Sequence, residues 1–216
     1  MNVIIQELKY LLKTKSIGTD SDRPLLLDFQ ATLETKPEKA IKLEKDALAQ
    51  IENITADNAR LVSNLHANLG GLYRMNGHPD LAREHMEKSI SLLDQFNLLH
   101  INDSIPQIAN YAMFLTEQQE PERGISELQK LSGIIKEYHS DHCLDYAKVQ
   151  ETLGTIYLMT ANLPQAKTHF KRAFKIYEKI WADEPEMIEA KYQEIQELYP
   201  QIGFCIGKNL SGLLTK

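Results

Sequence analysis

The sequence predicts an all-α fold, a right-handed superhelical solenoid of antiparallel helix pairs with about four repeats and a capping helix at each end. Three observations lead to this prediction. Blocks of sequence recur at a fixed interval, apolar residues within each block follow a helical period, and glycine (10) and proline (8) are sparse. Self-similarity over a period of 20–50 residues is typical of repeat architectures, in which each unit buries its apolar face against its neighbours.

The repeat interval is 42 residues. Three stretches superpose without gaps, beginning at Asn68, Asn110 and Thr152, so that each lies 42 residues after the last (110 − 68 and 152 − 110). Small residues, which would let two helices approach closely, recur in the same register at Gly70, Ala82, Ala112, Gly124, Gly154 and Ala166. Bulky residues that would fill the space between hairpins recur at Tyr73, Met86, Leu115, Leu128, Tyr157 and Phe170.

Each repeat reads as a helical hairpin. Apolar residues spaced by three and four positions indicate an amphipathic first helix. Gly77 follows that helix and is expected to adopt the left-handed conformation. Proline then suits the first turn of the second helix, where its missing N–H costs nothing. These prolines are Pro37, Pro79 and Pro121, with Pro164 displaced by one position. Two adjacent glycines inside the first helix, Gly70 and Gly71, are costly, and close packing explains both.

These residues resemble the tetratricopeptide repeat, and the best match is Leu153-Gly154…Tyr157…Ala166…Phe170…Ala173. The 42-residue length is similar to the longer variant found in kinesin light chains and in several bacterial regulators. The resemblance implies a solenoid with a concave face lined by first helices. Leu131 stands where the pattern has a small residue, which predicts looser packing at the far end of repeat three.

The register also predicts the domain organisation. Residues 1–216 are expected to form one domain, made of an N-terminal capping helix (1–19), a degenerate repeat one (20–54), repeat two (55–100), repeat three (101–141), repeat four (142–182), and a C-terminal capping helix and tail (183–216). Repeat one is degenerate because Asp28 and Glu44 occupy the positions of a small residue and an aromatic residue. A lone first helix is expected from Glu184 to Tyr199, before Pro200.

By resemblance, the concave face would take an extended peptide or a partner helix. The residues expected there are Asn64, Asn68, Gly71, Arg74, Gln107, Asn110, Met113, Lys148, Glu151 and Thr155. Asparagine amides both donate and accept, so Asn68 and Asn110 could hold a peptide backbone, although Thr152 breaks the series. The alternative is that both asparagines bond only to the neighbouring helix. Arg74 and Lys148 could select an acidic ligand.

Composition and motifs argue against several other classes of protein function. A net charge of −6 argues against nucleic acid as a partner. One cluster of basic residues falls at helical spacing and is interpreted as a solvent-exposed helix face; it comprises Lys167, Lys171, Arg172 and Lys175. The alternative is a patch that binds an acidic partner. The two cysteines show no disulfide or metal spacing, and no apolar run is long enough to cross a membrane. We therefore expect a cytoplasmic location and no membrane partner.

No catalytic or metal-binding arrangement is predicted either. The spacing favours neither a nucleophile with its base nor a phosphate loop, so we expect no enzyme activity and no cofactor. A polar run from His139 to Cys143 fits ordinary capping roles in a loop better than a metal site. His66, His85 and His169 are assigned to different faces and suggest no common site.

Three functions remain open. The first is a protein–protein interaction scaffold that binds a peptide or helical segment of a partner in its concave groove. The second is the ligand-sensing repeat domain of a bacterial peptide-responsive regulator. The third is a structural assembly protein that self-associates as a homodimer through its apolar C-terminal tail, residues 201–216.

Overall fold

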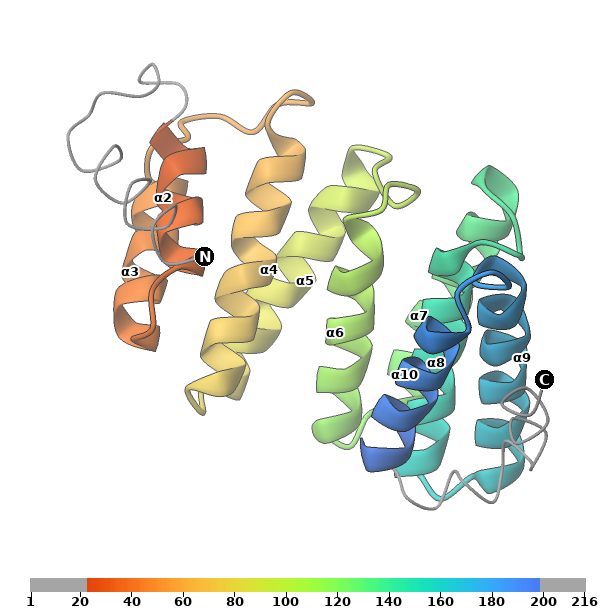
Figure 1. The fold of residues 1–216 in the computed structure, drawn as a ribbon. Coiled ribbons are helices and arrows are strands. Elements are labelled where there is room, and N and C mark those ends of the chain that lie inside the picture. The colour runs from red at the N-terminus through yellow and green to blue at the C-terminus, as the bar shows by residue number, and fades with distance from the viewer. Residues whose placement is uncertain (1–22, 199–216) are drawn as a thin grey trace. The chain divides into compact units, whose positions relative to one another are not determined.

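A computed structural model describes residues 23–198, and the regular elements in this range are all α-helices. Consecutive helices pack as the pairs α2–α3, α4–α5, α6–α7 and α8–α9, and α10 follows as a single helix (Figure 1). The all-helical prediction is therefore confirmed. The expected N-terminal capping helix (1–19) and the apolar tail (201–216) lie outside the described residues.

The chain divides into two compact units, Met1–Leu99 and His100–Lys216. The first unit contains α2 (Arg23–Thr32), α3 (Pro37–Leu48), α4 (Ala59–Met75) and α5 (Pro79–Gln95). The second contains α6 (Ser104–Glu117), α7 (Pro121–Tyr138), α8 (Leu144–Met159), α9 (Leu163–Ile180) and α10 (Pro185–Leu198).

Proline positions the start of the second helix in each pair. Pro37, Pro79 and Pro121 are the first residues of α3, α5 and α7, and Pro164 is the second residue of α9. The fixed φ of proline is already helical, and the first helical residue needs no hydrogen bond from its nitrogen. The predicted role of these prolines is confirmed.

The turns between paired helices share one backbone conformation at 42-residue intervals. The φ angle is 75° at Gly77, 65° at Gln119 and 59° at Ala161. In each turn the N–H of the following residue donates to a carbonyl five residues back, which closes the end of the first helix. These bonds are His78 N to Tyr73 O (2.9 Å), Glu120 N to Leu115 O (2.8 Å) and Asn162 N to Tyr157 O (2.7 Å). Only the first of these three turns has the glycine that this conformation favours.

Small residues mark the points where paired helices cross. A Cβ atom added to Gly70 would lie 2.6 Å from Met86 Cγ, and one added to Gly154 would lie 2.9 Å from the Phe170 ring. At Gly124 the added atom would lie 2.6 Å from the carbonyl oxygen of Ala112. Side-chain carbons do not approach other atoms this closely, so the predicted close packing is confirmed at these three glycines.

One detail of the packing differs from the sequence-based prediction. Apart from its chain neighbours and the backbone of its own helix, a Cβ added to Gly71 would meet no atom of the described residues within 4 Å, so close packing does not explain this glycine. One residue corresponds to a rotation of about 100° around a helix, which turns Gly71 away from the crossing that Gly70 occupies. Leu131, which stands where the pattern has a small residue, is only 1% exposed and lies in the core of repeat three.

Candidate partner-binding face

The residues expected on the binding face lie on first helices of both units. In the first unit α4 carries Asn64, Asn68, Gly71 and Arg74, all of them half-buried. In the second unit Asn110 on α6 and Lys148 on α8 are exposed. Half-buried residues flank them on the same two helices, namely Gln107, Met113, Glu151 and Thr155. Helices α6 and α8 contact each other, so the structure brings these six residues of the second unit onto neighbouring helices.

Asn68 and Asn110 occupy equivalent positions but have different surroundings. The amide nitrogen of Asn68 donates to Asp28 Oδ1 at 2.8 Å and to Glu44 Oε1 at 3.1 Å. Both donor hydrogens of Asn68 are thus directed at side chains of α2 and α3. Asn110 is exposed on α6. In the described structure, Asn68 therefore stabilises the first unit, whereas Asn110 presents its amide to solvent.

The Asp28–Glu44 pair explains why repeat one looked degenerate. These positions correspond to Gly70 and Met86 (28 + 42 and 44 + 42), so two carboxyl groups meet where a small and a bulky residue pack in repeat two. Glu44 is 1% exposed, and its Oε2 atom has no hydrogen-bond partner among the described residues. Burial, followed by the charge of Asp28, raises the pKa of Glu44 to about 8, and burial also raises the pKa of Asp28. The pair thus retains a proton at neutral pH, because two carboxylates in contact cannot both ionise cheaply.

Glu151 is held by two helices that follow it in sequence. Its Oε2 accepts a hydrogen bond from the Tyr177 hydroxyl of α9 at 2.6 Å, and its Oε1 lies 2.9 Å from Lys191 Nζ of α10. Burial and the neighbouring carboxylate of Glu151 raise the pKa of Tyr177, so the phenol stays protonated and continues to donate. Glu151 therefore ties α10 to the α8–α9 pair.

The hydroxyl and ammonium groups nearby are partly engaged within α8. The Thr155 hydroxyl donates to the backbone oxygen of Glu151 at 3.1 Å, which is a bond within the helix. The exposed Lys148 forms an ion pair with the half-buried Asp145 at 3.6 Å. Ion pairs at the surface contribute little to stability, so the ammonium group of Lys148 can also contact another anion. Lys148 is therefore accessible to a ligand. Thr155 would offer a ligand mainly its methyl group, because its hydroxyl is already bonded within the helix.

Polar contacts between paired helices were missed by the sequence reasoning. His66 and His85 were assigned to different faces, but their Nδ1 atoms lie 2.8 Å apart. In repeat four, 84 residues later, the same two positions hold Gln150 and His169, whose polar atoms lie 2.9 Å apart. Burial, with a smaller effect of His85, lowers the pKa of His66 to about 4, so this contact forms between neutral rings. The 42-residue register, applied to polar residues as well as apolar ones, is the signal that could have found these pairs.

Residues 23–198 provide no arrangement for a metal ion. No group of three or more histidine, cysteine, aspartate or glutamate side chains comes together there as a set of ligands. Cys143 caps α8, accepting a hydrogen bond from the backbone N–H of Tyr146 at 3.4 Å, as its capping role predicts. Within the same range, the helices are too short or too polar to cross a membrane.

Comparison with known proteins supports the repeat assignment. Residues 104–179 match the family described as tetratricopeptide repeat. No curated protein sequence matches this chain. The solved structure of BtubC (BKLC) from P. vanneervenii is similar, with a TM-score of 0.67 and 18% identity over 92% of this chain and 80% of its own.

Two structures from Podosopora anserina, described as a "putative kinesin light chain" with nearly identical TPR-like repeats, also match. The form with a single substitution has a TM-score of 0.68 and 14% identity, covering 84% of this chain and 90% of its own. The other form has a TM-score of 0.65 and 14% identity, covering 83% of this chain and 90% of its own. At these identities the likeness shows the fold. Residues 104–179 are therefore tetratricopeptide repeats, and the chain that carries them has the fold of kinesin-light-chain-like repeat proteins.

Proposed function

We propose that this chain is a protein–protein interaction module that holds a peptide or helical segment of a partner against the first helices of its repeats. Tetratricopeptide repeats generally act as interaction modules and are typically non-catalytic. The observation that carries the proposal is that the neighbouring helices α6 and α8 each keep a polar side chain exposed. Asn110 and Lys148 are exposed, while Leu115 and Leu153 on the same two helices are buried.

The chemistry of these exposed groups suits an extended segment with an acidic residue. The amide of Asn110 can donate to a backbone carbonyl and accept from a backbone N–H, which holds a peptide without reading its side chains. Lys148 supplies a positive charge about one α8 turn from Glu151 and about two turns from Thr155. The half-buried Gln107 and Met113 on α6 add polar and apolar contact area. In the first unit taken by itself, Asn64, Gly71 and Arg74 of α4 are the corresponding candidates, while the amide of Asn68 already donates to Asp28 and Glu44.

Peptide selection followed by variant binding tests this proposal. Random peptides of about a dozen residues displayed on phage are selected on the immobilised full chain, and the best peptide is measured by fluorescence anisotropy. The double variant Asn110→Ala/Lys148→Ala should weaken binding at least tenfold. The control Gln129→Ala/Lys167→Ala removes comparable atoms from exposed positions on α7 and α9 and should change binding less than twofold.

The substituted residues are chosen so that a loss of peptide binding does not arise from a loss of folding. Asn110 and Lys148 are exposed, so both double variants should retain the helicity of the original chain by circular dichroism. Light scattering on the same samples shows whether self-association competes with peptide binding. A failure to select any peptide, or an equal loss of affinity in both double variants, would refute binding on this face.

A further inference from the structure

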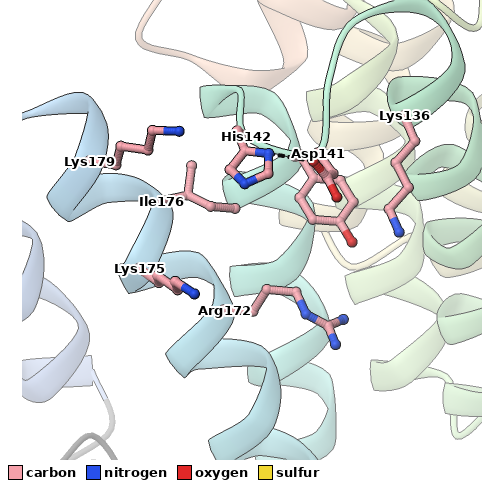
Figure 2. A pocket seen from close by; sticks show the side chains of 8 residues that line it. Lys136, Asp141, His142, Arg172, Lys175, Ile176 and Lys179 are labelled. Atoms are coloured by element: carbon pink, nitrogen blue, oxygen red, sulfur yellow. Dashed lines mark ion pairs between the residues drawn. The ribbon is translucent and has the colours of Figure 1, made fainter.

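A second surface of the molecule gathers positive charge around a pocket. The pocket has a volume of about 440 Å³ and lies in the second unit, between α9 and the α7–α8 connection (Figure 2). Four cationic side chains line it, namely Lys136 from α7 and Arg172, Lys175 and Lys179 from α9. Positions 172, 175 and 179 are three and four residues apart, which places them on one side of the helix.

The charge of these four cations is not balanced by nearby carboxylates. Among residues 23–198, none of the four forms an ion pair with a carboxylate. The lining includes a single acidic side chain, Asp141, which contacts His142 beside it. The formal charge of the lining, with His142 neutral, is thus +3 (four cations less one carboxylate) in a chain whose net charge is −6. A local positive field in an acidic protein concentrates anions at that site.

A buried residue orients one of the cations. Gln150 is 1% exposed, and its Oε1 accepts a hydrogen bond from Arg172 at 3.1 Å and one from the His169 ring at 2.9 Å. Burial, and then Arg172, lower the pKa of His169 to about 4, so this ring is neutral and donates from Nδ1. Gln150 thereby fixes one edge of the guanidinium and leaves its remaining donors for a ligand. This ordering distinguishes Arg172 from an unconstrained surface cation.

The rest of the lining suits a ligand larger than a single ion. Tyr146 and Ile176 are both buried and contribute apolar surface, while Lys136 lies over the Tyr146 ring at 5.2 Å. The volume falls in the usual range for small-molecule sites, about 300–1,000 Å³. The four cationic groups carry more positive charge and more hydrogen-bond donors than a single carboxylate, with its two oxygens, could balance. A phosphate group has three terminal oxygens and up to two charges, and Arg is well suited to bind it.

We propose that this pocket, defined by Lys136, Arg172, Lys175 and Lys179, binds a phosphate-bearing ligand independently of the partner-binding face. Arg172 would bind the phosphate oxygens directly, and the three lysines would neutralise its charge. The phosphate could belong to a small molecule or to a phosphorylated side chain, since both present the same group. Its four cations lie on the second helices α7 and α9, and neither Asn110 nor Lys148 lines the pocket.

The test compares two pairs of cations on the same helix. Isothermal titration of the full chain with pyrophosphate is carried out at low and at near-physiological salt. The variant Arg172→Gln/Lys175→Gln should weaken binding at least tenfold. The control Lys167→Gln/Lys171→Gln also removes two positive charges from exposed positions on α9, but outside the pocket, and should weaken binding less than twofold.

A second titration identifies the source of the phosphate. A peptide with one phosphoserine is compared with its unphosphorylated form on the same three proteins. Binding of pyrophosphate alone assigns a small-molecule site, and phosphate-dependent binding of the peptide assigns a phosphorylated partner; either supports the proposal if the two variants differ as stated. Equal weakening in both variants would show diffuse charge attraction and overturn it, as would a failure of both probes to bind.

Discussion

A single methyl group added at Gly124 tests how closely the paired helices of repeat three cross. The new Cβ atom would lie 2.6 Å from the carbonyl oxygen of Ala112 and 3.2 Å from its Cα. Both are backbone atoms of α6, so no side-chain rotation relieves the overlap and the two helices must separate. Overpacking of this kind costs about 1–3 kcal/mol, from which the better helix propensity of alanine recovers about 1 kcal/mol. We expect Gly124→Ala to lower the free energy of unfolding by up to about 2 kcal/mol.

The same helix provides the control. Gly133 also lies in α7 and is exposed, and an added Cβ would meet no atom of the described chain within 4 Å apart from its chain neighbours and the backbone of its own helix. Gly133→Ala should therefore raise the free energy of unfolding by up to about 1 kcal/mol through helix propensity alone. Urea denaturation followed by circular dichroism measures both variants. If they change stability in the same direction and to the same extent, the crossing at Ala112 is not as close as described.

The remaining predictions concern the turns and the buried acid pair. Gln119→Gly and Ala161→Gly should each raise the free energy of unfolding by about 0.5–1 kcal/mol, because glycine adopts positive φ without strain; Gly77→Ala should lower it similarly in the same urea assay. The pKa of Glu44 is raised from 4.5 to about 8 in the folded chain. The free energy of unfolding should therefore fall as the pH rises between these two values, by no more than about 1.4 kcal/mol per pH unit. Urea titrations from about pH 5 to 9 should show a flatter profile for Glu44→Gln, and an unchanged profile would contradict the pKa shift. Asn68→Ala should destabilise the fold by about 1–3 kcal/mol by removing donors from two half-buried or buried carboxyl groups, and a neutral thermal melt would show that Asn68 is not structural.

The fold was predictable because each of its determinants has a short-range signature. Proline at the start of a second helix, a small residue at each helix crossing and a bulky residue one helical turn away all leave marks that repeat every 42 residues. These marks are sufficient to predict the all-helical fold and its consecutive helix pairs. Gln119 and Ala161 show the limit of this reasoning, since their left-handed conformation comes from the repeated turn and not from any local preference of glutamine or alanine.

The site was harder to predict because side-chain partners depend on contacts between helices. The register correctly made Asn68 and Asn110 equivalent, but it did not show that Asp28 and Glu44 would bind the first of them. The arrangement of positive charges around the pocket was equally hard to predict from the sequence. Arg172 and Lys175 were recognised as part of a basic helix face, whereas Lys136 joins them only because α7 packs against α8 and α8 packs against α9.

The most direct test of partner binding on the first helices is a photo-cross-linking map. A peptide selected on the full chain is synthesised with a benzophenone side chain at successive positions, irradiated with the protein, and the linked residues are identified by mass spectrometry. The proposal predicts cross-links on α6 and α8, with Met113 a favourable acceptor beside Asn110. Cross-links confined to α7 and α9 would contradict it and would place the partner on the opposite helices of each pair.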